Sequence, residues 1–129
     1  MFTVSIKGVF VTPSKEIVLL MNEGDEWELP SGRIELGETP ESCVEREINQ
    51  ELVLTVVVEQ LLDTYLFKVI PCKYVFIVTY RCTLKSPFIP RISNEHKKIG
   101  TFPVDRLPQN LLQGYRSSIA AWSLRTKTP

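Results

Sequence analysis

Four stretches of the chain are rich in apolar and β-branched residues in the way that β-strands are. Residues 2–11 (FTVSIKGVFV) and 16–21 (EIVLLM) flank a Thr-Pro-Ser turn signal at 12–14, which predicts two strands, most simply arranged as a hairpin. Residues 54–70 and 73–84 are the longest β-prone segments, and the proline that separates them predicts neighbouring antiparallel strands.

A helix is predicted at about residues 40–52. Thr39 can accept hydrogen bonds from the free N–H groups of the first turn, and Pro40 fits the first helical position without losing a needed donor. At 100° per residue the segment forms one apolar stripe, which predicts that it packs on a sheet through Val44, Ile48 and Leu52.

The tail of the chain predicts a second helix, because Tyr115, Ile119 and Trp122 recur at helical spacing. Residues 85–110 contain four prolines and are predicted to form a loop, a short strand and a turn. Strands before and after a central helix indicate an α+β fold, with a sheet covered by helices on its faces and a single domain over residues 1–129.

Composition excludes several classes of partner. Fifteen Lys and Arg balance fifteen Asp and Glu, so no overall field draws the chain to a nucleic-acid polymer or an anionic membrane. No apolar stretch approaches the roughly 20 residues of a membrane span, and the first residues show no signal-peptide pattern. We therefore expect a cytoplasmic protein. Its three cysteines form no C-x-x-C pair and are expected to be buried, reduced and structural: Cys43, Cys72 and Cys82.

The predicted helix carries two carboxylates, Glu47 and Glu51, one turn apart along the border of its apolar stripe. Partial burial of unpaired charges costs several kcal/mol, so a cation should compensate them. The same geometry points Arg46 away from that border. A hard divalent metal fits oxygen ligands at this spacing, and Mg²⁺ or Mn²⁺ would suit them. An ordinary amphipathic helix with a solvated acidic face is the alternative interpretation.

The turn before the helix favours the metal site over a solvated acidic face. Residues 29–33 (LPSGR) place Gly32, which lets backbone approach a ligand closely, beside Arg33, a forked donor suited to phosphate. We therefore predict that both residues bind substrate. Together with the two carboxylates, this turn is typical of a site for a diphosphate and a metal.

These residues closely resemble the signature of the Nudix hydrolase family, G-x5-E-x7-R-E-U-x-E-E-x-G-U, in which U is an aliphatic residue. Seven of the nine defined positions agree, and the register holds over the whole box. The resemblance implies an α/β/α sandwich with a mixed β-sheet and hydrolysis of a nucleoside diphosphate linked to another group X, with Mg²⁺ as the usual cofactor. The residues at the nine positions are Gly32, Glu38, Arg46, Glu47, Ile48, Gln50, Glu51, Val53 and Leu54.

The resemblance also implies roles for single residues. Glu47 and Glu51 would bind the metal, helped by the backbone carbonyl of Gly32, while Glu38 and Arg46 would form an orienting ion pair. Catalysis would then rest on Glu47, Glu51 and Arg46. The metal would neutralise diphosphate charge and activate water, and a carboxylate would take the proton.

The general base of the family varies and can come from a later loop, where this chain has Glu95. A solvated loop residue is the equally weighted alternative. His96 is interpreted as structural or as a substrate contact. Four aromatic residues could stack on a purine, although aromatics in such a domain more often belong to the core: Trp27, Tyr65, Phe67 and Tyr80.

Two positions depart from the signature. Gln50 replaces a glutamate, which removes a charge but keeps a carbonyl oxygen that could still bind metal. Val53 replaces the glycine after the helix, where a left-handed backbone is common and a β-branched residue is disfavoured, so a rearranged helix end is expected. These departures support an alternative: a catalytically silent Nudix domain that binds a nucleotide as a sensor or interaction module.

The substrate is narrowed only to a class of small molecule. ADP-ribose-like compounds, nucleoside triphosphates and dinucleoside polyphosphates all stay open. A nucleoside diphosphate sugar is favoured, because residues 27–38 (WELPSGRIELGE) resemble that branch of the family. The resemblance is also compatible with a homodimer.

Overall fold

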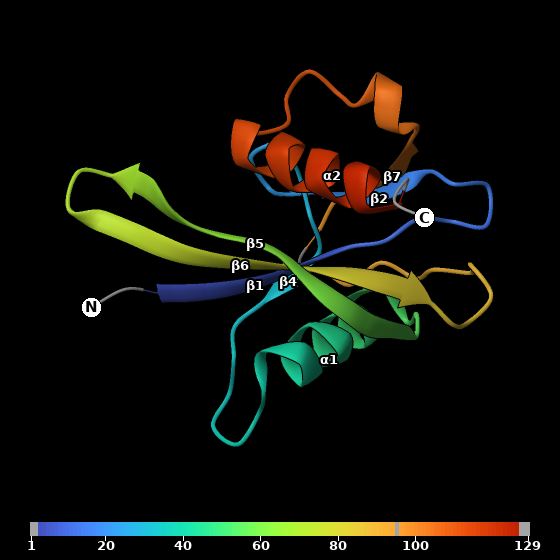
Figure 1. The fold of residues 1–129 in the computed structure, drawn as a ribbon, viewed down its shortest axis with the longest axis horizontal. Helices are drawn as coiled ribbons and strands as arrows, with labels where there is room; N and C mark the ends of the chain where they lie inside the picture. The colour runs from blue at the N-terminus through green and yellow to red at the C-terminus, as the bar shows by residue number, and fades with distance from the viewer. Residues whose placement is uncertain (1–2, 95, 127–129) are drawn as a thin grey trace.

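The computed structural model describes residues 3–94 and 96–126 and shows, within them, two β-sheets and two α-helices (Figure 1). The elements in chain order are β1 (Thr3–Val9), β2 (Ile17–Met21), β3 (Trp27–Glu28), β4 (Ser31–Gly32), α1 (Pro40–Leu52), β5 (Val56–Ile70), β6 (Lys73–Leu84), β7 (Lys98–Phe102), the 3₁₀ turn η1 (Val104–Arg106) and α2 (Gln113–Thr126).

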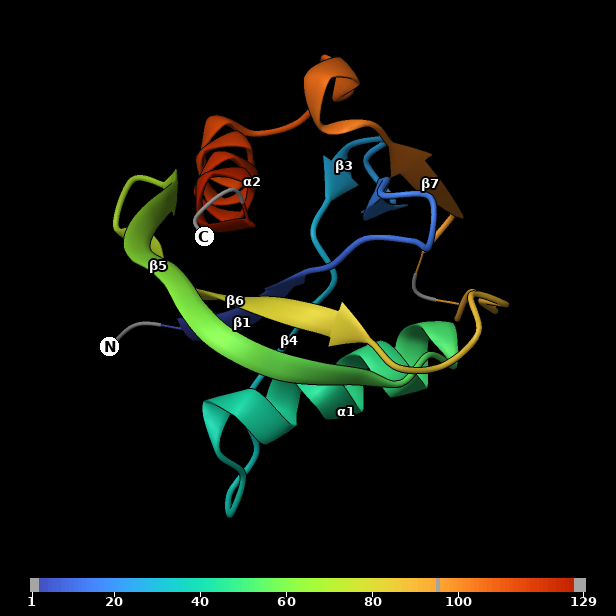
Figure 2. The ribbon, with the colours of Figure 1, turned by 45° about the vertical axis from the view of Figure 1, so that its right-hand side comes forward.

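The larger sheet has the strand order β4-β1-β6-β5 and is mixed, since β1 runs parallel to β6 while the other two pairs are antiparallel. The smaller sheet, β3-β2-β7, is antiparallel throughout. Helices α1 and α2 lie on opposite faces of the larger sheet (Figures 1 and 2). The predicted α+β class, a mixed sheet between helices, is confirmed.

The predicted hairpin between residues 2–11 and 16–21 is wrong. The two segments meet in one isolated antiparallel bridge, Val11 with Ile17, and then diverge into different sheets. The reason is that β1 is an interior strand with β4 on one side and β6 on the other, so its backbone groups are already paired. The other predicted pair, β5 with β6, is confirmed as antiparallel.

Helix α1 begins where the sequence predicts. The Thr39 hydroxyl accepts a hydrogen bond from the Ser42 N–H at 3.0 Å, and the Ser42 hydroxyl accepts one from the Thr39 N–H at 3.1 Å, which closes a capping box. Its stripe of Val44, Ile48 and Leu52 is fully buried against the larger sheet. Truncating one such side chain to alanine typically costs about 2–5 kcal/mol.

Helix α2 covers the other face of the larger sheet. Tyr115, Ile119 and Trp122 are all buried there, as their spacing predicts, in a second core that also contains residues of β2 and β3. Among the residues that the structure describes, neither helix is long and apolar enough to cross a membrane.

The three cysteines are free thiols, and two of them meet the expectation of burial. Cys43 of α1 and Cys82 of β6 lie in the core between that helix and the larger sheet. Cys72 is exposed, because it forms the tight turn between β5 and β6 with a positive φ of 69°. The expectation that all three are buried is therefore wrong for Cys72.

Candidate functional site

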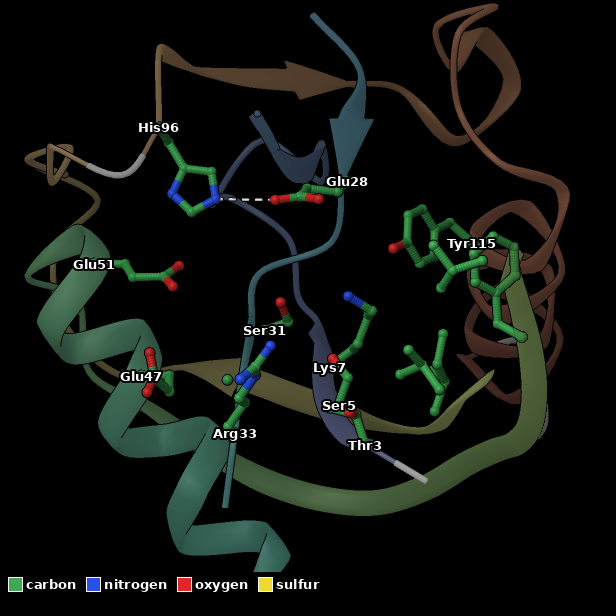
Figure 3. Close-up of a pocket in the computed structure, with 15 residues that line it drawn as sticks. Thr3, Ser5, Lys7, Glu28, Ser31, Arg33, Glu47, Glu51, His96 and Tyr115 are labelled. Atoms are coloured by element: carbon green, nitrogen blue, oxygen red, sulfur yellow. Dashed lines mark hydrogen bonds and ion pairs between the residues drawn. The ribbon is translucent and has the colours of Figure 1, made fainter. Parts of the chain in front are cut away.

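Helix α1 presents Glu47 and Glu51 to one cavity. The two carboxylates come from adjacent turns and both line it (Figure 3). Glu51 is only 6% exposed. Gly32 of β4 is the residue that makes room for Glu47, since a Cβ built at position 32 would lie 1.9 Å from the Glu47 Cγ. The glycine is therefore a steric requirement of the carboxylate's position.

The guanidinium of Arg46 holds this arrangement together. Its Nε donates to Glu38 Oε2 at 2.5 Å and its Nη2 to Glu38 Oε1 at 2.9 Å, while Nη1 donates to Glu47 Oε1 at 2.7 Å. The expectation that Arg46 points away from the carboxylate border is wrong, because its long side chain folds back across the helix surface. Its hydrogen bond with Glu38 and then that with Glu47 raise the pKa of Arg46 further, and the same contact lowers the pKa of Glu38.

The cavity has a volume of about 610 Å³ and extends from the carboxylates of α1 across the larger sheet to α2. Thr3, Ser5 and Lys7 of β1 alternate onto this face of the sheet, as side chains two residues apart in a strand do (Figure 3). Tyr115 of α2 closes the end opposite the carboxylates. Apolar side chains of β5 and β6 also line the cavity: Phe67, Val69, Val75 and Ile77.

A carboxylate–imidazole pair forms the wall of the cavity near β3. His96 Nε2 lies 3.0 Å from Glu28 Oε1, although the residues are far apart in sequence, and both line the cavity (Figure 3). Beside it, Lys97 Nζ donates to Asp25 Oδ1 at 2.6 Å. The two contacts fasten the segment that precedes β7 to β3 and to the turn before β3. The sequence left His96 as structural or as a substrate contact, and its position serves both interpretations.

Lys7 is a buried cation at the middle of the cavity. It is 5% exposed, and its ammonium lies 5.0 Å from the centre of the Tyr115 ring. Burial lowers the pKa of Lys7 to about 8, against the opposing charges of Glu28 and Glu51. Burial acts to raise the pKa of Glu28, but the hydrogen bond with His96, together with the charge of Lys7, keeps it below its usual value.

The box from Gly32 to Leu54 thus lies beside a cavity on a mixed sheet, and a model of the NUDIX domain family matches residues 1–122. The chain belongs to the NUDIX domain family. The predicted recognition is confirmed, and so is the class of enzyme, a Nudix pyrophosphohydrolase, at the level of the family.

Individual relatives agree with this membership. A MutT-like protein of Streptomyces ambofaciens is 28% identical over 114 residues, which cover 88% of this chain and 71% of that protein. The MutT protein of Methanosarcina mazei Go1 has a similar fold, with a TM-score of 0.83 at 18% identity over 98% of this chain and 96% of that one. An ADP-ribose pyrophosphatase of Streptococcus suis 89-1591 gives a TM-score of 0.76 at 18% identity, over 99% and 94% of the two chains.

The two departures from the Nudix signature have structural explanations. Gln50 is exposed, and its Oε1 accepts a hydrogen bond from Arg46 Nη1 at 3.1 Å, so it extends the arginine network and is not among the residues that line the cavity. Val53 takes up the left-handed conformation itself, with φ 57° and ψ 40°, and its N–H donates to the Asn49 carbonyl at 2.9 Å. The expected rearrangement of the helix end is therefore wrong.

The donor set of this Nudix site suits a hard divalent cation, but it is incomplete by itself. Within residues 3–94 and 96–126, no group of three or more His, Cys, Asp or Glu side chains could hold a metal ion. Glu47 and Glu51 supply two carboxylates to one cavity, beside the Gly32 backbone. Mg²⁺ typically binds through one or two carboxylates and takes its other ligands from water and substrate phosphates. The residues present therefore fit a cation that arrives with a phosphorylated substrate.

Sequence reasoning missed part of the cavity. Lys7, Glu28 and Tyr115 were not singled out as site residues, yet all three line it. The sequence did contain one indication of this part of the cavity. Polar residues occur at every second position of β1, on a face that would be apolar if the strand were buried on both sides: Thr3, Ser5 and Lys7. Arg33 does line the cavity as predicted for a substrate contact, whereas Glu95 lies outside the described residues.

Proposed function

We propose that this chain is a metal-dependent hydrolase that cleaves the diphosphate linkage of a nucleoside diphosphate joined to another group X, with ADP-ribose or a sugar nucleotide as the favoured class. One observation carries the proposal. Glu47 and Glu51 face a cavity of about 610 Å³ that Tyr115 closes at the opposite end and that apolar side chains of β5 and β6 also line. That arrangement suits a ligand with a charged diphosphate at one end and an apolar or planar group at the other.

The chain's own residues would share the work as follows. Glu47 and Glu51, with the Gly32 carbonyl, would hold Mg²⁺, or Mn²⁺ in its place, whereas Gln50, expected from the sequence as a further oxygen donor, has its Oε1 engaged by Arg46 and does not line the cavity. A bound cation would neutralise diphosphate charge and acidify a nearby water. Arg46 fixes the Glu47 carboxylate through the contact at 2.7 Å and is itself fixed by Glu38. This pre-organisation keeps the metal ligand in place before substrate arrives.

Substrate would enter along Arg33, whose guanidinium is suited to a phosphate, and Gly32, whose lack of a side chain leaves the backbone accessible. The proton of the attacking water would pass to a carboxylate. A box glutamate or Glu95 would accept it. Location in the cytoplasm, a homodimer and the absence of a nucleic-acid polymer as partner stay predictions.

A second candidate function rests on Gln50. It replaces a glutamate of the signature, so the site lacks that carboxylate. The amide that stands in its place is exposed, and its oxygen accepts a hydrogen bond from Arg46 at 3.1 Å. Fewer charges weaken metal binding. A catalytically silent domain would then hold a nucleotide in the same cavity with little dependence on metal.

The deciding experiment is a turnover assay with ADP-ribose, sugar nucleotides, nucleoside triphosphates and dinucleoside polyphosphates in Mg²⁺ or Mn²⁺. Glu51→Gln keeps the shape of the side chain and removes its charge. We expect it to lower kcat/KM on the order of 100-fold or more, since several kcal/mol of charge stabilisation depend on the metal. Glu59→Gln, on an exposed position of β5, serves as the matched control and should behave like the wild type.

The outcomes separate the two candidates. Metal-dependent cleavage that Glu51→Gln abolishes and Glu59→Gln retains supports the hydrolase and names its substrate class. Nucleotide binding by all three proteins without any turnover supports the silent domain. Cleavage that survives Glu51→Gln at the wild-type rate refutes the proposed role of the carboxylate pair.

A further inference from the structure

Lys7 is a buried charge that the roles assigned so far do not use. Its side chain is 5% exposed, and it lines the cavity between the carboxylates of α1 and the ring of Tyr115 (Figure 3). No hydrogen bond or ion pair joins its ammonium to any of the residues whose side chains the structure describes, 3–94 and 96–124. A buried ammonium is costly unless something negative compensates it.

The surroundings of Lys7 fix where that negative group would lie. Glu28 and Glu51 attract the ammonium, but neither forms an ion pair with it. Glu28 is instead engaged by His96 at 3.0 Å. The face of the ammonium that is turned to the cavity is therefore open to a ligand. Ser5, two residues before Lys7, and Ser31, its partner across the β1–β4 pair, flank that space with polar groups.

An anion at this place would be a phosphate of the substrate. A lysine binds phosphate as a compact point charge with three donors, whereas the carboxylates at the other side of the cavity repel a phosphate unless a cation lies between. A diphosphate has two phosphoryl groups, and only one of them can be nearest to Glu47 and Glu51. The second then extends toward the middle of the cavity, where the ammonium lies.

We propose that Lys7 binds the substrate phosphate that is remote from the Glu47–Glu51 pair, and thereby selects for diphosphate-containing ligands over those with a single phosphate. This role deepens the proposed function and rests on it for the identity of the substrate class. It also orders the substrate in the cavity. One phosphorus lies at α1, the second at Lys7, and the group beyond it lies against Tyr115 and the apolar side chains of β5 and β6.

The test uses inorganic pyrophosphate and inorganic phosphate as probes, in EDTA, so that it needs neither metal nor turnover. Each is titrated into ¹⁵N-labelled protein while the backbone amide signals around Lys7 are followed, a method that reads weak binding. Lys7→Met removes the charge at similar length, and Lys7→Arg keeps it. Lys68→Met, at an exposed position of β5 that does not line the cavity, controls for net charge.

We expect saturable shifts at β1 in the wild type, with pyrophosphate binding more tightly than phosphate. Loss of one charged contact should weaken pyrophosphate binding about tenfold or more in Lys7→Met. Lys68→Met should match the wild type, and Lys7→Arg should retain more affinity than Lys7→Met. Equal pyrophosphate affinity in wild type and Lys7→Met, or no saturable shift at β1 in the wild type, overturns the proposal.

Hydrolysis supplies a separate readout. If the enzyme turns over a nucleoside diphosphate derivative, Lys7→Met should raise KM with little change in kcat, because a contact present in ground state and transition state alike contributes to binding only. If no substrate is cleaved, the proposed hydrolase fails while the pyrophosphate titration still decides the role of Lys7. An unchanged KM in Lys7→Met would count against that role.

Discussion

Replacing Lys7 by methionine should stabilise the fold near neutral pH, although it removes a charge from the cavity. Burial lowers the pKa of this lysine from 10.5 to about 8, in spite of the attraction to Glu28 and Glu51. At ~1.36 kcal/mol for each pKa step, keeping the ammonium charged in the folded chain costs about 3 kcal/mol. The substitution also loses the cation–π contact with the Tyr115 ring at 5.0 Å, which costs about 1 kcal/mol. We therefore expect the free energy of unfolding of Lys7→Met to exceed that of the wild type by about 2 kcal/mol.

The size of the stabilisation depends on pH. Below pH 8 the lysine is protonated in both the folded and the unfolded chain, and the folded chain bears the full cost of burial. Between pH 8 and 10.5 the folded chain releases a proton that the unfolded chain keeps, so the stability of the wild type rises. The advantage of Lys7→Met should therefore shrink to below about 1 kcal/mol at pH 9.5. The ionisable groups that face the ammonium are Glu28 from β3, Glu51 from α1 and Tyr115 from α2.

Urea unfolding in EDTA and a reducing agent, followed by tryptophan fluorescence at pH 7 and pH 9.5, measures both quantities. Trp27 and Trp122 are buried and report unfolding of the second core. Lys68→Met, at an exposed position, should change stability by no more than about 0.5 kcal/mol at either pH. The reasoning is refuted if Lys7→Met is less stable than the wild type at pH 7, or if its gain is the same at both pH values.

Two further substitutions test the geometry of the box. Gly32→Ala should lower kcat/KM about 100-fold, because the new Cβ would lie 1.9 Å from the Glu47 Cγ and must displace that carboxylate. Gly24→Ala is the control: its Cβ would meet no heavy atom closer than 3.4 Å, so it should be neutral in the same assay. Wild-type activity in Gly32→Ala would contradict this account. Val53→Gly should raise the free energy of unfolding by about 0.5–1 kcal/mol, because it relieves a left-handed φ of 57° at an exposed valine. Val53→Ala should show no such gain, and an equal gain in both variants would exclude backbone strain as its cause.

The features that the sequence determined by itself depend on interactions between residues that are close in the chain. The capping box at Thr39, the apolar stripe of α1 and the one-turn spacing of Glu47 and Glu51 all depend on residues within a few positions of one another. The antiparallel pairing of β5 with β6 follows in the same way, since a short turn joins them. Those features, with the nine-position signature, were enough to predict the family and the α+β class.

The tertiary structure alone decided how distant segments meet. The pairing of β1 with β6 joins residues about 70 positions apart, and it is this parallel pair that turns Lys7 toward the cavity and excludes the predicted hairpin. The contact between Glu28 and His96 likewise spans 68 positions. The direction of Arg46 was misjudged because helical rotation fixes only its Cβ, whereas its partners Glu38 and Glu47 fix the guanidinium. A periodic pattern specifies which face of an element is buried, but strand partners are chosen by the whole chain, because backbone hydrogen bonds are the same for every sequence.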